Sequence, residues 1–123
     1  MTKETKMKHP VVWFEINGND ANALHGFYGE LFGWKIAADN PMNYGMVEAE
    51  KGRGIPGGIG QKDEKNPGVT FYVSTTSIDD SLKAAEKLGA KTLMPRTQLP
   101  GGTILAFFAD PDGNAVGLVE EAA

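Results

Sequence analysis

Strand-forming residues fill positions 11–16, where side chains of different character alternate. Alternation with a period of two predicts a β-strand in which neighbouring side chains point to opposite faces. Phe14 and Ile16 then share one face, and Trp13 and Glu15 share the other. Each face of this strand therefore has its own chemistry.

The next segment carries apolar residues at the i, i+3, i+4 and i+7 spacing of a helix stripe. These residues are Leu24, Phe27, Tyr28 and Leu31. Asn19 and Asp20 offer an N-cap before the helix, and Gly33 offers a stop after it. Gly26 and Gly29 lie inside the helix, where glycine costs stability, so they predict close packing against another backbone.

Short strand-like runs follow the helix, with turn-forming residues between them. They cover residues 34–38, 44–49 and 55–59. The first half of the chain therefore predicts the order βαβββ. A polar stretch at about 61–68, ending in Asn66-Pro67-Gly68, is typical of a linker.

The pattern then begins again. Residues 69–73 predict a strand, and Ser77 followed by Asp80 resembles a capping box. The second helix has its own apolar stripe, formed by Leu82, Ala85 and Leu88, and Gly89 ends it as Gly33 ends the first. Further strand-like runs cover 91–94, 104–109 and 115–119.

This repeat predicts one α+β domain over residues 1–123, with module one at about 9–60 and module two at about 69–120. If each helix covers one face of its sheet, the other faces can meet in a shared cup. The predicted cup-facing residues are Trp13, Glu15, Thr70, Tyr72, Ala115, Gly117 and Val119. Mixed aromatic and polar side chains are typical of a small-molecule site.

Six residues are the candidate ligand-binding set: Trp13, Glu15, Tyr44, Met46, Thr70 and Tyr72. A plain structural role competes with each assignment, since large apolar and aromatic side chains can simply fill a core. Glu15 is the one candidate for catalysis. If buried, it must be paired, hydrogen-bonded or protonated; an ion pair with Arg53 or Arg96 is the structural alternative to ligand binding or general-base work.

Two segments resemble the vicinal oxygen chelate superfamily, which includes glyoxalase I, extradiol dioxygenases and bleomycin-binding proteins. They are 27–34 (FYGELFGW), similar to that family's first-helix ending, and 110–114 (DPDGN), similar to its turn before the last strand. The resemblance covers about 9–120 and is strongest to short proteins related to lactoylglutathione lyase. It implies a glyoxalase-like half-open barrel of two βαβββ modules with a central cup.

The resemblance also implies a metal site, with ligands on the first and fourth strands of each module. Those positions fall on Trp13, Thr70 and Gly117 and within 55–60, and none offers a good ligand. A catalytic metal needs about three protein ligands. The prediction is therefore no metal and no cofactor.

A metal-dependent enzyme remains the alternative. Its ligands would come from unexpected positions such as Glu15, Gln61 or Glu48, or from a partner chain, and the metal would be a divalent ion such as Ni, Zn, Mn or Fe. The two histidines, His9 and His25, precede the first strand and sit on the first helix, so we expect neither to face the cup.

Composition narrows the class of protein further. The 123 residues are 41% hydrophobic and include no cysteine, which excludes disulfides and thiolate chemistry. A net charge of −4 disfavours nucleic acid as a partner. We expect no membrane partner and a cytoplasmic protein, because no run is apolar enough to span a bilayer and residues 1–8 lack a signal-peptide core.

Three functions remain open. The leading one is a metal-free binder of a small molecule in an aromatic-lined cup. The alternatives are a metal-dependent lyase or dioxygenase of the glyoxalase type, and a non-catalytic interaction or structural protein. The resemblance and the predicted free strand edges also favour a homodimer.

Overall fold

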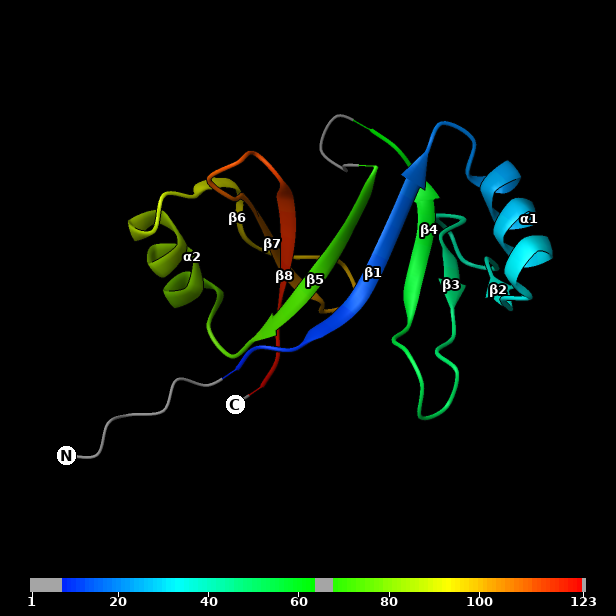
Figure 1. Ribbon diagram of the computed structural model, residues 1–123, viewed down its shortest axis with the longest axis horizontal. Coiled ribbons are helices and arrows are strands. Elements are labelled where there is room, and N and C mark those ends of the chain that lie inside the picture. Colours follow the sequence, from blue (N-terminus) through cyan, green and yellow to red (C-terminus); the bar gives the residue numbers. More distant parts are fainter. Residues whose placement is uncertain (1–7, 64–67, 123) are drawn as a thin grey trace.

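A computed structural model describes residues 8–63 and 68–122 as an α+β fold, with two helices on one eight-stranded sheet (Figure 1). In chain order the elements are β1 (Val11–Gly18), α1 (Ala21–Phe32), β2 (Ile36–Ala37), β3 (Gly45–Val47), β4 (Gly57–Gln61), β5 (Val69–Thr75), α2 (Ile78–Lys87), β6 (Lys91–Gln98), β7 (Ile104–Ala109) and β8 (Ala115–Glu120). The predicted βαβββ order therefore occurs twice.

Several predicted boundaries were wrong by a few residues. The run at 34–38 shrinks to the two residues of β2, and the run at 91–94 extends to Gln98 in β6. Gln61, predicted to begin the linker, ends β4 instead. Residues 1–7 and 64–67, where the sequence places the basic start of the chain and part of the linker, lie outside the described residues.

The two modules join at the centre of the sheet, whose strand order is β2-β3-β4-β1-β5-β8-β7-β6. β1 and β5 pair antiparallel, and each also pairs in parallel with the last strand of its own module. Parallel neighbours need a long crossover, and in each module the helix and two strands provide it. The first strand of each module thus lies in the middle of the sheet.

Register separates the two faces of the sheet as predicted. Phe14 pairs with Phe71 on the face that the helices cover, while Trp13 pairs with Tyr72 and Glu15 with Thr70 on the opposite, helix-free face. Tyr72 in turn pairs with Gly117 of β8. The helix-free face, defined by these last residues, carries the predicted site.

Module two has a compact apolar core under α2. Its buried residues are Ile78, Leu82, Ala106 and Leu118. Ser77 caps the helix by accepting a hydrogen bond from the Asp80 amide, but its own amide donates to the Thr75 hydroxyl, so half of the predicted capping box is confirmed. Leu88 was predicted to belong to the buried stripe and is 77% exposed, because it follows the last helical residue.

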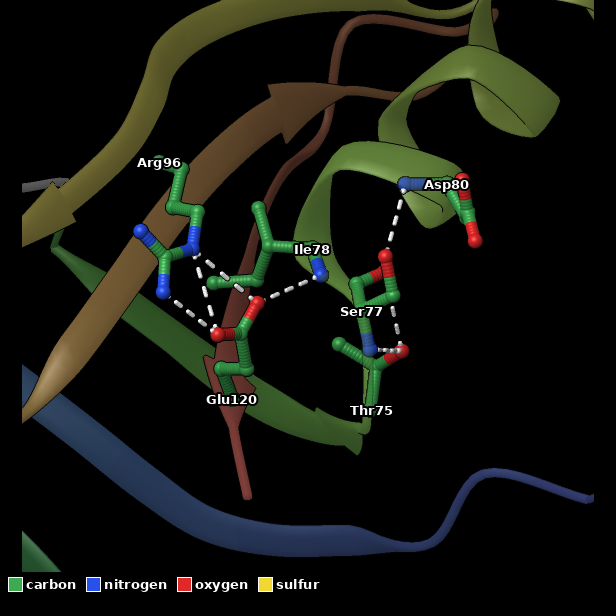
Figure 2. Close-up of polar contacts among 6 residues, drawn as sticks. All are labelled: Thr75, Ser77, Ile78, Asp80, Arg96 and Glu120. Carbon is green, nitrogen blue, oxygen red and sulfur yellow. Dashed lines mark hydrogen bonds and ion pairs between the residues drawn. The ribbon is translucent and has the colours of Figure 1, made fainter. Parts of the chain in front are cut away.

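A carboxylate on β8 fastens the start of α2 (Figure 2). Glu120 accepts a hydrogen bond from the Ile78 amide at 2.9 Å and forms an ion pair with Arg96 of β6 at 2.7 Å. The Arg96 hydrogen bonds hold the pKa of the Glu120 carboxyl below its usual range. One side chain therefore ties three elements of module two together.

Module one packs its helix differently. Asp20 caps α1 and Gly33 ends it, both as predicted. The predicted stripe is half wrong, since Phe27 and Leu31 are each more than half exposed. The buried side of the helix instead carries Ala21, His25 and Tyr28, which are spaced at i, i+4 and i+7. Phe27 and Leu31 lie outside this stripe and are exposed.

The two helix glycines differ from each other. A side chain at Gly26 would meet nothing within 4 Å, so the predicted backbone packing was wrong there. A Cβ atom at Gly29 would lie 3.4 Å from the Trp34 carbonyl oxygen and 3.8 Å from Ile36 of β2, so the predicted close packing against another backbone is confirmed at this position. Across the described ranges, no helix is both long and apolar enough to span a bilayer.

Candidate functional site

Glu15 lies in β1 at the centre of the sheet and is only 8% exposed. Its Oε2 atom accepts a hydrogen bond from the Tyr44 hydroxyl at 2.8 Å. Its Oε1 atom accepts two, from the Tyr72 hydroxyl and from Nδ2 of Asn17, both at 3.1 Å. A buried carboxylate needs such donors to offset its lost hydration.

Trp13 extends this arrangement by donating its Nε1 hydrogen to the Tyr44 hydroxyl at 3.0 Å. We call these residues the Glu15 cluster: Trp13, Glu15, Asn17, Tyr44 and Tyr72. Hydrogen bonds run in one direction, from indole to phenol to carboxylate. Side chains from both modules thus converge on one acid.

The predicted ion pair of Glu15 was wrong. Arg96 pairs with Glu120 instead, and Arg53 makes no ion pair with Glu15. The spacing of residues in the sequence does not show which arginine lies near Glu15. The strand order does so for Arg96, because β6 lies at the edge of the sheet, away from β1.

The pKa values of the two tyrosines are shifted by burial and by the nearby acid. Burial, followed by the negative charge of Glu15, raises the pKa of Tyr44 well above its usual range. The same two causes, in the same order, raise the pKa of Tyr72. Both phenols therefore remain protonated near neutral pH and act as hydrogen-bond donors.

Tyr44 is held in place by its backbone. Asn40 accepts a hydrogen bond from the Tyr44 amide at 2.9 Å and donates one to the Tyr44 carbonyl at 2.8 Å. The ring then lies against Gly58 of β4, where any Cβ atom would overlap it. The turn at 40–43 thus delivers the phenol to Glu15.

Tyr72 has an equivalent seat in module two. Its ring lies over Gly117 of β8, and a Cβ atom there would overlap the ring. The other side of Tyr72 faces Phe107, with ring centroids 5.4 Å apart. Glycine is therefore required beneath both rings, at Gly58 and at Gly117.

These seats decide whether the metal site implied by the resemblance fits this chain. Trp13, Gly58 and Gly117 offer no ligand atom in their side chains, and Thr70 donates its hydroxyl to the Ala115 carbonyl at 2.8 Å. Within residues 8–63 and 68–122, no three His, Cys, Asp or Glu side chains come together in a way that could hold a metal. The residues present do not fit the implied metal centre.

The other predicted site residues lie at varied distances from the acid. Thr70 is buried and pairs with Glu15 across β1 and β5. Met46 lies on the same face and pairs with Gly58, but is 44% exposed. Glu48 is exposed, and Gln61 serves α1, accepting a hydrogen bond from the Ala21 amide at 3.1 Å.

Both histidines bond to backbone and stay outside the cluster, as predicted. His25 donates from Nε2 to the Ile59 carbonyl at 2.9 Å, and His9 donates from Nδ1 to the Ser74 carbonyl at 3.1 Å. Asn17 is the cluster member that sequence reasoning did not select. Its signal was the alternation of β1, which places it two residues beyond Glu15 on the same face.

The members of the Glu15 cluster differ in their exposure to solvent. Two open, shallow hollows lie on the exposed sides of α1 and α2, and the cluster lines neither. Trp13 and Tyr44 are partly exposed, whereas Glu15 and Tyr72 are buried. Solvent therefore reaches the cluster through its indole and its first phenol.

Similarity to known proteins agrees with this fold. The sequence pattern described as the glyoxalase-like domain matches residues 13–119. The chain belongs to the glyoxalase-like domain family. This places it in the vicinal oxygen chelate superfamily, as the resemblance implied.

Named relatives of this glyoxalase-like chain are distant. It is 26% identical over 114 residues to a Mycobacterium tuberculosis protein named "Putative glyoxylase CFP32", covering 86% of this chain and 43% of that protein. It is 28% identical over 120 residues to the anthracycline biosynthesis protein DauV of a Streptomyces species, covering 84% and 44%. The chain thus spans less than half the length of these relatives.

A solved structure shows the same fold. The glyoxalase/bleomycin resistance protein/dioxygenase superfamily member from Vibrio splendidus 12B01 superposes with a TM-score of 0.66 at 14% identity. The match covers 93% of this chain and all of that chain. At this identity the likeness concerns the fold alone.

Proposed function

We propose that this glyoxalase-like chain binds a small organic molecule at the Glu15 cluster and does so without a metal. One observation carries the proposal: of the positions implied for metal ligands, Gly117 and Gly58 (within 55–60) lie beneath two tyrosine rings, and both tyrosine hydroxyls bond to one buried acid. Aromatic faces with a few convergent polar groups suit a small organic ligand. The partly exposed Trp13 and Tyr44 are the groups a ligand meets first.

A thermal-shift screen of small aromatic compounds, run with and without EDTA, tests the proposal. A compound that binds the folded state raises the melting temperature. We expect shifts that are equal in both buffers and that shrink in the Trp13→Phe and Tyr72→Phe variants. The Phe27→Ala variant, altered on the exposed side of α1, is the matched control and keeps the full shift.

The metal-dependent alternative predicts the opposite pattern. Shifts would then disappear in EDTA and return when nickel, zinc, manganese or iron(II) is restored. Shifts that are identical in wild type and both cluster variants would instead place binding elsewhere. Either result contradicts the proposal.

We also propose a homodimer in solution. The edge strands of the sheet, β2 and β6, present backbone groups that a second chain can pair with. Light scattering at micromolar concentration should give twice the mass of one chain. A monomer mass would contradict this part of the proposal.

A further inference from the structure

The charge on Glu15 has no cationic partner within the described chain. Asn17, Tyr44 and Tyr72 donate to it, and all three are neutral donors. No lysine or arginine nitrogen of the described residues lies within 4.0 Å of the Glu15 carboxyl oxygens. The ion pair found among these residues joins Arg96 to Glu120 in module two. Neutral hydrogen bonds offset part of the lost hydration of a carboxylate but supply no counter-charge for it.

The carboxylate also keeps acceptor capacity. Two ionised oxygens offer about four acceptor positions in total. Among the described residues, Oε1 receives two hydrogen bonds and Oε2 receives the one from Tyr44. Oε2 therefore keeps an acceptor position next to the hydroxyl of the partly exposed Tyr44.

Aromatic side chains complete the surroundings of this oxygen. The ring faces of tryptophan and tyrosine attract cations electrostatically, and tryptophan does so best. Trp13 and Tyr44 supply such faces and are linked by a 3.0 Å hydrogen bond. An anionic ligand would face the uncompensated charge of Glu15, and the whole chain carries a net charge of −4.

We propose that the ligand of the Glu15 cluster is an organic cation, with a protonated amine that donates to Oε2 of Glu15 while its apolar body lies against Trp13 and Tyr44. This inference rests on the proposed function, because it names the class of ligand for that same site.

Three probes that share one ring and differ in charge test the inference. They are 2-phenylethylamine, 2-phenylethanol and phenylacetate, titrated at pH 7 in EDTA. The Trp34→Phe background leaves Trp13 as the only tryptophan of the chain, so its emission reports on the cluster. Calorimetry on the wild type provides the dissociation constants.

We expect the amine to bind roughly tenfold or more tightly than the alcohol, and the carboxylate to bind weakest. Glu15→Gln should bring amine and alcohol to similar affinities, whereas Glu30→Gln, which removes an exposed charge on α1, should leave their ratio unchanged. If Glu15→Gln does not fold, Tyr44→Phe replaces it. That variant frees an acceptor position on Oε2, so the preference for the amine should be kept or increased.

The outcomes separate this inference from the proposed function. Equal binding of amine and alcohol, sensitive to Tyr72→Phe, overturns the inference and leaves small-molecule binding intact. Tighter binding of phenylacetate overturns the inference as well. If none of the three probes changes Trp13 emission or produces heat, both proposals fail for this class of ligand.

Discussion

The two modules of this protein share one topology and divide its work differently. Module two holds the better apolar core, in which Ile78 is fully buried and Glu120 fastens the helix start. Module one buries Val47 and Ile59 in its sheet but only Ala21 on α1, and it supplies four members of the Glu15 cluster. The comparison teaches that one copy of the repeat holds its helix by an apolar cluster, while the other carries most of the polar chemistry.

Module one adds polar contacts that hold α1 in place. Gln61 bonds to both the Asn19 carbonyl and the Ala21 amide at the helix start, and His25 bonds to the Ile59 carbonyl. Aromatic side chains pack at the C-terminal end of α1, where the rings of Tyr28 and Trp34 stack with their centroids 5.5 Å apart. Each anchor is local, so residues on β1 remain available for the site.

The largest expected effect tests where stability resides. Ile78→Ala should lower the free energy of unfolding by about 2–5 kcal/mol, because it leaves a cavity in the core of module two. Phe27→Ala, on the exposed side of α1, removes an edge-on ring contact with Tyr28 and should lower it by only about 0.5–1.5 kcal/mol. Urea unfolding of both variants measures the difference, and equal losses would refute the division of labour.

Substitutions at Gly58 and Gly117, the glycines beneath the two tyrosine rings, should have smaller effects on stability that differ between the modules. Gly117→Ala should destabilise the protein by about 1–3 kcal/mol, since Tyr72 is buried and cannot move aside. Gly58→Ala should cost less, because the partly exposed Tyr44 can turn outward. It should nevertheless break the Tyr44 hydrogen bond to Glu15. Urea unfolding with emission of Trp13 in the Trp34→Phe background follows both effects, and an undisturbed Tyr44 would show that Gly58 is not its seat.

Removing one hydroxyl at a time tests the acid's partners. Tyr72→Phe should cost about 1–3 kcal/mol, because the buried Oε1 loses a donor to a charged group. Tyr44→Phe should cost less, since Tyr44 is partly exposed whereas Tyr72 is buried. Chemical denaturation of the two variants should therefore rank Tyr72 above Tyr44, and the reverse order would contradict the burial argument.

Alkaline pH should weaken the wild type more than either phenylalanine variant. The folded pKa of both tyrosines is raised, so above pH about 10 the unfolded chain releases protons that the folded chain keeps. Stability contributed by the two phenols is present below that pH and is lost as the pH rises further. Urea midpoints at pH 8 and pH 11 measure the change.

The smallest expected effect concerns the ion pair between Glu120 and Arg96 in module two. The folded pKa of Glu120 is lowered by Arg96, so its contribution is present above the unfolded pKa and disappears as the pH falls through the folded value. Wild type should therefore be more stable than Glu120→Gln at pH 7 and should approach it at acidic pH. A difference that grows on acidification would contradict this sign.

Periodicity predicted the fold well because both modules repeat one pattern of strand, helix and capping residues. The alternation in β1 placed Trp13 and Glu15 on one face, and the pairing of β1 with β5 then brought Tyr72 opposite Trp13. The buried sides of the helices were harder to predict. Phe27 and Leu88 look like core residues by hydropathy, yet tertiary packing leaves both exposed.

The bonds inside the site could not be predicted from spacing. Glu15 was expected to find an arginine, but strand order places Arg96 at the far edge of the sheet. Tyr44 reaches the acid only because the turn at 40–43 directs its ring onto Gly58. Loop conformation and ring packing of this kind leave no periodic trace in the sequence.

Elemental analysis of the purified protein is the most direct test of the central claim, that two tyrosine rings and one acid take the place of a metal centre. The protein would be incubated with nickel, zinc, manganese or iron(II) and then passed through gel filtration. The account predicts that no metal is retained in stoichiometric amount. About one tightly held ion per chain, lost in the Glu15→Gln variant, would contradict it.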